Sequence, residues 1–135
     1  MQTPIVDFVK QYANKNNSRF HMPGHKGQAF LGCEAFDITE ITGADSLYEA
    51  NGIIAESEKN ASLLFHTKQT LFSTEGSSQC IRAMLYLVVA HFIEQNATNI
   101  HNTNKKPYII ASRNVHKAFL YACALIDFDI ICTVP

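Results

Sequence analysis

A glycine followed by two serines, at residues 76–78, ends one apolar segment and precedes a long amphipathic stretch. Gly76 allows a tight backbone turn, and Ser77 and Ser78 then occupy the start of the next helix, where unpaired N–H groups and the positive end of the helix dipole are exposed. Such a helix start stabilises a phosphate group without any lysine. We therefore predict that a phosphate binds at Gly76 to Gln79.

A histidine is the second candidate for chemistry. His116 follows a later apolar segment and stands at the expected start of another helix. A flat imidazole can pack against an aromatic ring and can donate a hydrogen bond to a carboxylate. Both candidates also have a simpler interpretation, because Ser77 or Ser78 can serve as an ordinary helix N-cap and His116 as a capping residue.

Hydrophobic periodicity predicts the elements that position these residues. Thr3 is the expected N-cap of a helix that has Pro4 at its first position, and residues 18–52 lack any sustained period and form a long irregular arm. Helices are expected at 53–65, 77–95 and 115–126, and strands at 69–74, 108–111 and 129–134.

Alternating strands and helices of this kind predict a parallel sheet that is covered on both faces. Ligands of such sheets bind at the carboxyl ends of the strands. The turn at Gly76 follows the first expected strand and His116 follows the second, so position and chemistry agree. The fold class is therefore α/β.

Several further segments carry a resemblance to a known family. They are Phe20-His21-Met22-Pro23-Gly24-His25-Lys26-Gly27, Asp37 to Ile41, Gly43 to Tyr48, Gly52 to Glu58, the serine turn, and Arg113 to Lys117. In order and spacing they resemble the N-terminal part of the Orn/Lys/Arg decarboxylases, which are fold-type-I enzymes that use pyridoxal phosphate. Members of that family are several times longer, so the chain resembles only their opening portion.

The resemblance implies a fold and a set of roles. It implies an N-terminal helix and extended arm, residues 1–52, and an incomplete cofactor-binding large domain, residues 53–135, with a parallel sheet that is part of a three-layer αβα structure. The residues that match Ser77, Ser78 and the backbone of Gln79 hold the cofactor phosphate, beside Gly76, and the residue that matches His116 stacks on the pyridine ring. Glu75 stands where a neutral Asn is common, and a carboxylate there weakens phosphate binding unless it points away.

The resemblance also implies what the chain lacks. Pyridoxal chemistry needs a lysine that bonds the cofactor and an acid that keeps the pyridine nitrogen protonated. Both come later in the family than the residues present here, and Lys117 is no substitute because it directly follows the stacking histidine. The chain alone is therefore expected to be inactive, whereas the complete enzyme would decarboxylate arginine, lysine or ornithine in amino-acid metabolism and polyamine biosynthesis.

Composition limits the other possibilities. A net charge of −1, from 11 Lys+Arg against 12 Asp+Glu, gives no basic surface for nucleic acid or for an anionic membrane. The four cysteines lack metal spacing and occupy apolar contexts, which predicts buried thiols and a cytoplasmic protein. His21 and His25 are four residues apart, but Pro23 breaks a helical face, so no metal site is expected.

Two functions therefore remain open. The first is the N-terminal fragment of a pyridoxal-phosphate decarboxylase that binds a small amino acid and assembles with a second copy or with the remainder of the enzyme. The second is a catalytically silent remnant, or a small module that binds a phosphorylated ligand or a partner chain.

Overall fold

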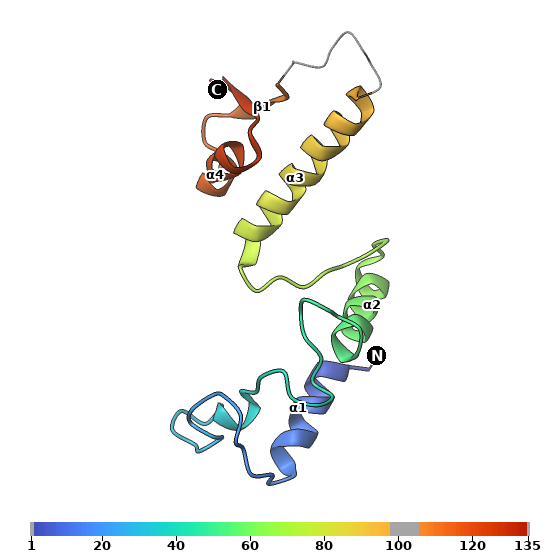
Figure 1. Ribbon diagram of the computed structural model, residues 1–135, viewed down its shortest axis with the longest axis vertical. Coiled ribbons are helices and arrows are strands. Elements are labelled where there is room, and N and C mark those ends of the chain that lie inside the picture. Colours follow the sequence, from blue (N-terminus) through green and yellow to red (C-terminus); the bar gives the residue numbers. More distant parts are fainter. Residues whose placement is uncertain (1, 98–105, 135) are drawn as a thin grey trace. The chain divides into compact units, whose positions relative to one another are not determined.

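The computed structural model describes residues 2–97 and 106–134 and divides the chain into two compact units, unit 1 (residues 1–72) and unit 2 (residues 73–135). Figure 1 shows α1 and α2 in unit 1, and α3, β1 and α4 in unit 2. The elements of the described residues are α1 (Pro4–Asn14), the 3-10 helix η1 (Glu34–Phe36), α2 (Ile53–Phe65), α3 (Gly76–Asn96), β1 (Tyr108–Ser112), α4 (Lys117–Ile126) and β2 (Asp129–Thr133). The boundary between arm and large domain expected after residue 52 stays a prediction. In this structure α2, which follows that boundary, packs against α1 of unit 1.

Helix α1 begins as the sequence predicts. Thr3 is its N-cap residue and Pro4 occupies the first helical position. The Asp7 carboxylate accepts hydrogen bonds from the backbone N–H of Thr3 at 3.2 Å and from its hydroxyl at 3.1 Å. These bonds fix the start of the helix from within its first turn.

Carboxylates organise the irregular arm. Glu34 is 8% exposed and accepts hydrogen bonds from the N–H groups of Phe30, Leu31 and Gly32 at 2.5 to 2.9 Å. These donors, with Leu31 first among them, lower the pKa of Glu34 to about 2. A segment without apolar periodicity is thus held by backbone hydrogen bonds to one side chain.

Asp45 does the same for the loop before α2. Its carboxylate accepts from the N–H groups of Ser46 and Gly52 at 2.8 Å and of Ile54 at 3.1 Å. Burial favours the neutral form of this carboxyl, but the backbone donors outweigh burial and hold its pKa below the ordinary value. Asp45 therefore caps α2 from outside the helix.

The strand expected at 69–74 is wrong, because the described residues form only β1 and β2. Side chains of α2 take the backbone donors of this segment instead of a neighbouring strand. The N–H of Thr70 donates to the Ser62 hydroxyl at 2.8 Å, and the N–H of Phe72 donates to the Glu58 carboxylate at 2.7 Å. The apolar run is consequently a connection whose backbone is hydrogen-bonded to side chains of α2.

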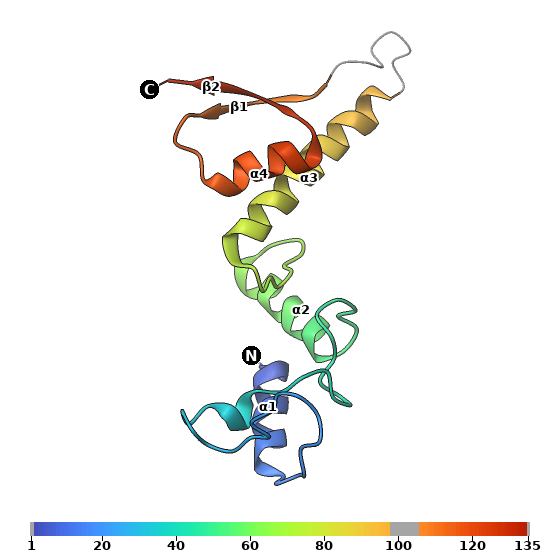
Figure 2. The ribbon, with the colours of Figure 1, turned by 60° about the vertical axis from the view of Figure 1, so that its left-hand side comes forward.

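Unit 2 contains a parallel sheet, as predicted, with β1 and β2 paired from Tyr108 opposite Asp129 to Ser112 opposite Thr133. Figure 2 shows α3 and α4 on the same side of this sheet. The core between them consists of Leu85 and Val89 from α3, Ala122 from α4, and Phe128, all at most 3% exposed. Helices cover one face in the described residues, so the three-layer arrangement stays a prediction.

Much apolar surface of unit 2 remains in contact with solvent. Along α3, exposed fractions between 45% and 66% belong to Met84, Tyr86, Leu87, Val88, Phe92 and Ile93. On the sheet, Ile110 and Ile131 are 63% and 49% exposed. So many large apolar side chains on one small unit are typical of a surface that another chain or domain covers.

The prediction of buried thiols is wrong for most of the cysteines. All four are free, and Cys33, Cys80 and Cys132 are exposed while Cys123 is half-buried. Apolar neighbours in sequence did not indicate burial, because the apolar surfaces around these residues are themselves uncovered. Within the described part of the chain, none of the helices combines the length and apolar character needed to cross a membrane.

Candidate functional site

The serine turn forms the start of α3. The helix begins at Gly76, whose φ of +62° lies in the left-handed region that favours glycine. Ser77 and Ser78 therefore lie inside the first helical turn, two and three residues after the N-cap residue Glu75. Their simpler interpretation as N-caps is wrong, because Glu75 is the N-cap residue.

The first turn of α3 has no side chain that caps it within the described residues. The carboxylate of Glu75 pairs instead with the Arg82 guanidinium, two turns along the helix. The Ser73 hydroxyl donates to the side-chain carbonyl of Gln79 at 2.5 Å rather than capping the helix. Backbone donors of the first turn thus remain available to an external acceptor.

Space beside the turn is open. A Cβ atom built on Gly76 would meet no other atom within 4 Å, and Ser77 is exposed while Ser78 is half-buried. An anion can therefore approach the backbone closely. The ion pair with Arg82 also directs the Glu75 charge toward a cation, which reduces the repulsion that this carboxylate would exert on a phosphate.

His116 is the N-cap of α4, and that helix begins at Lys117 rather than at Val115 as expected. The backbone of His116 is extended, with φ −62° and ψ 143°, so the helical hydrogen bonding starts one residue later. Its Nδ1 accepts a hydrogen bond from the N–H of Ala118 at 3.2 Å. An accepting Nδ1 places the proton of the neutral ring on Nε2. The capping interpretation is therefore confirmed, and the imidazole remains exposed.

The two candidates lie at one end of unit 2. Figure 2 shows that α3 and α4 both begin on the side where β1 ends. The connection from β1 to α4 is tied down there by a hydrogen bond from the N–H of Arg113 to the Thr133 carbonyl at 3.2 Å. Parallel sheets bind ligands at this edge.

The opposite edge carries a salt-bridge cluster instead. Lys106 lies 2.7 Å from the carboxylate of Asp127 and 2.9 Å from that of Asp129. These partners raise the pKa of Lys106 above its ordinary value. Asp127 has φ +63° and ends α4, and Asp129 begins β2.

Sequence reasoning missed the partner of Glu75. Residues seven apart lie on one face of a helix, so Arg82 was in reach of the helix start, but many such pairs form on surfaces without consequence. Over residues 2–97 and 106–134, no three histidine, cysteine or acidic side chains gather in a way that would hold a metal ion.

Comparison with known proteins relates the chain to one family. The family model for the Orn/Lys/Arg decarboxylase major domain matches residues 3–131. An arginine decarboxylase of Halalkalibacterium halodurans is 34% identical over 131 residues, and one of Bacillus subtilis is 30% identical over 131 residues; each alignment covers 90% of this chain and 24% of the relative. The uncharacterized protein YaaO of Bacillus subtilis is 28% identical over 144 residues, covering 100% of this chain and 27% of the relative.

No solved structure matches the chain significantly. The chain spans about a quarter of the length of the curated relatives that it matches. The family model covers nearly all of the residues, including the serine turn and His116. The chain therefore belongs to the Orn/Lys/Arg decarboxylase family.

Proposed function

We propose that this chain provides the phosphate-binding turn and the ring-stacking histidine of a pyridoxal-phosphate-dependent decarboxylase that acts on arginine, lysine or ornithine. The observation that carries the proposal is the start of α3, where a left-handed glycine is followed by two serines and, among the residues that the structure describes, no side chain caps the helix. A helix start with backbone donors available and open space beside it favours a bound dianion.

The residues present fit the phosphate end of this cofactor. Gly76 admits close approach to the backbone, Ser77 and Ser78 offer hydroxyl donors, and the N–H groups through Gln79 point along the positive end of the helix dipole. When bound, pyridoxal phosphate supplies a ring that accepts the electrons released as the substrate loses its carboxyl group. The turn binds the cofactor and sets its position, and Arg82 keeps the neighbouring Glu75 charge engaged.

His116 orients the ring in this proposal. Its hydrogen bond with Ala118 fixes both the ring plane and the tautomer, with the proton on Nε2. The face of the imidazole can then pack on the pyridine ring, and Nε2–H can donate to the carboxylate of the amino-acid substrate. Capping and stacking are compatible, because capping uses only the lone pair of Nδ1.

The lysine that bonds the cofactor and the acid that protonates its ring nitrogen come, in this proposal, from the remainder of the enzyme. The exposed apolar residues of α3 and of the sheet support an assembly with that remainder or with a second copy. The implied setting is the cytoplasm and the metabolism of basic amino acids, including polyamine biosynthesis.

A binding experiment tests the phosphate turn. The ligand is 4′-deoxypyridoxine phosphate, which lacks the aldehyde and so cannot react with surface lysines, and its matched control is 4′-deoxypyridoxine without phosphate. Equilibrium dialysis should show tighter binding of the phosphorylated ligand to the chain. Equal affinities would exclude a phosphate site.

A charge variant identifies the location of the site. Ser77→Asp places a carboxylate in the first turn of α3. The carboxylate stabilises the helix by interacting with the positive end of its dipole but repels phosphate, so a loss of binding cannot be ascribed to unfolding. We expect about a fivefold loss of affinity, since interactions at helix termini are worth up to about 1 kcal/mol at exposed sites. Gln2→Glu adds the same charge in unit 1 and should leave the affinity unchanged. Equal losses in the two variants would contradict the assignment.

A further inference from the structure

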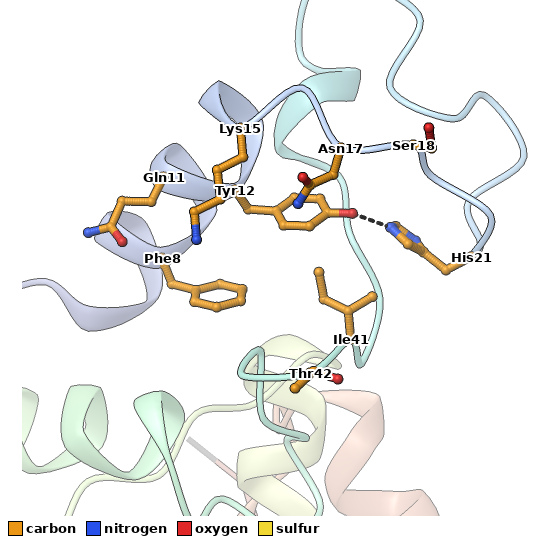
Figure 3. Close-up of a pocket in the computed structure, with 9 residues that line it drawn as sticks. All are labelled: Phe8, Gln11, Tyr12, Lys15, Asn17, Ser18, His21, Ile41 and Thr42. Atoms are coloured by element: carbon orange, nitrogen blue, oxygen red, sulfur yellow. Dashed lines mark hydrogen bonds between the residues drawn. The ribbon is translucent and has the colours of Figure 1, made fainter.

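Unit 1 contains a cavity of about 490 Å³ that the proposed function does not use. Figure 3 shows it between α1 and the two segments that carry His21 and Ile41. The residues that line it are Phe8, Gln11, Tyr12, Lys15, Asn17, Ser18, His21, Ile41 and Thr42. Its volume is within the range of sites for small molecules, about 300–1,000 Å³.

Two aromatic rings and one aliphatic side chain, from Phe8, Tyr12 and Ile41, form the apolar part of the cavity wall. The rings of Phe8 and Tyr12 are nearly parallel, with an interplanar angle of 11° and centroids 6.4 Å apart. Figure 3 shows Ile41 pointing toward these rings from the facing segment. A flat apolar group suits such a space, because it can contact two aromatic rings and an aliphatic side chain.

The Tyr12 wall is held rigidly. His21 Nδ1 lies 2.5 Å from the Met22 carbonyl, which can only accept, so Nδ1 carries the proton. His21 Nε2 therefore accepts the hydrogen bond from the Tyr12 hydroxyl at 2.7 Å. On the ring itself, the Arg19 guanidinium lies 4.9 Å from the centroid and is fixed by a hydrogen bond to the Ala35 carbonyl at 2.7 Å. A wall fixed in this way loses little entropy when a ligand binds.

The rim of the cavity is positive. Lys15 is the one lysine or arginine among the lining residues, and none of them is an aspartate or a glutamate. The C-terminal end of α1 adds a partial negative charge of about 0.5, which is smaller than the full charge of the ammonium group. Asn17 and Ser18 beside it offer neutral hydrogen-bond donors. The rim therefore favours an anionic group.

We propose that this cavity binds a small aromatic carboxylate. The ring of the ligand packs among Phe8, Tyr12 and Ile41, and its carboxylate accepts hydrogen bonds from the Lys15 ammonium and from the amide of Asn17. The site lies wholly within unit 1, so it does not depend on the phosphate turn of α3.

An NMR titration of the ¹⁵N-labelled chain tests this site with 1-naphthoate, and with the neutral 1-naphthalenemethanol as a matched probe. We expect saturable shifts of the amide signals of Tyr12, His21 and Ile41, and tighter binding of the carboxylate. Shifts that do not saturate, shifts scattered over the chain, or equal affinities of the two probes would overturn the proposal.

Two variants distinguish the contribution of the Lys15 charge to binding from that of the apolar wall. Lys15→Gln, at an exposed position, should lower the affinity for 1-naphthoate about two- to fivefold and leave that for the alcohol unchanged. Lys10→Gln is the control, since Lys10 is an exposed lysine of α1 that does not line the cavity. Ile41→Thr keeps the branch at Cβ but shortens the side chain by one carbon and introduces a hydroxyl, and should weaken both probes. Equal effects of the two lysine variants would refute the anion contact.

Discussion

His116 is given two tasks that can be separated by substitution. It caps α4 through Nδ1, and in the proposed function its ring stacks on the cofactor. His116→Ala removes both the cap and the ring. His116→Asn removes the ring but retains a side-chain oxygen that is among the best acceptors at an N-cap position.

The effect on stability follows from the cap. Losing an N-cap acceptor costs about 1 kcal/mol, and for a domain of about 60 residues this lowers the melting temperature by about 4–8 °C. We expect this loss in unit 2 for His116→Ala and little change for His116→Asn. Thermal unfolding followed by circular dichroism measures the difference.

The effect on cofactor binding follows from the ring. Stacking of two aromatic rings contributes about 0.5–1.5 kcal/mol, which corresponds to about a 2- to 12-fold change in affinity. Both variants should lose this amount for 4′-deoxypyridoxine phosphate, because both lack the imidazole. The two substitutions thus differ in stability but agree in binding.

Capping and stacking by His116 can be refuted separately. Equal melting temperatures for the two variants would show that the hydrogen bond to Ala118 does not stabilise α4. Binding by His116→Asn that equals that of the unaltered chain would show that the ring does not stack on the cofactor. The second result would remove His116 from the site while leaving the phosphate turn intact.

Three further predictions concern the core, the arm and catalysis. Phe128→Ala should destabilise unit 2 by about 3–5 kcal/mol in chemical denaturation, because Phe128 is fully buried and its ring packs edge-on against that of Phe119, with the centroids 5.8 Å apart. The control Val134→Ala, at a side chain that is 76% exposed, should change the free energy of unfolding by less than about 0.5 kcal/mol. The pKa of Glu34 is lowered from 4.5 to about 2, so its stabilisation of the arm is complete above pH 4.5 and is lost as the pH falls toward 2; Glu34→Gln should reduce this acid dependence in amide exchange. The purified 135-residue chain should release no carbon dioxide from arginine, lysine or ornithine, and turnover would refute the division of the active site between this chain and the remainder of the enzyme.

Local sequence patterns predicted the helices well. The bounds of α2 were predicted to the residue, and α3 is one residue longer at each end than expected. These helices have an apolar period, which is a local property of the sequence. The parallel pairing of β1 with β2 also followed from pattern alone, because a helix of suitable length connects two short apolar segments.

The errors in predicting secondary structure arose where a side chain distant in sequence binds the backbone. Residues 69–74 have the composition of a strand, but the Ser62 hydroxyl and the Glu58 carboxylate occupy two of their backbone donors. The hydrogen bonds of Glu34 and Asp45 inside the arm were likewise invisible, since an acidic residue in a loop is ordinarily solvated. Periodicity contains no information about such side-chain to backbone contacts.

For the candidate site, sequence predicted the turn but not its surroundings. A glycine and two serines before a helix indicated a helix start, yet only the structure excluded the serines as caps and paired Glu75 with Arg82. The role of His116 as a cap was an open alternative, and geometry decided it.

The residues that bind the cofactor phosphate can be mapped by NMR. Amide shifts of the ¹⁵N-labelled chain should be recorded during titration with 4′-deoxypyridoxine phosphate and, separately, with 4′-deoxypyridoxine. We expect the phosphorylated ligand to shift the amides of Ser77, Ser78 and Gln79 far more than the control does. Unchanged amides at these three residues, with saturable shifts elsewhere, would contradict it.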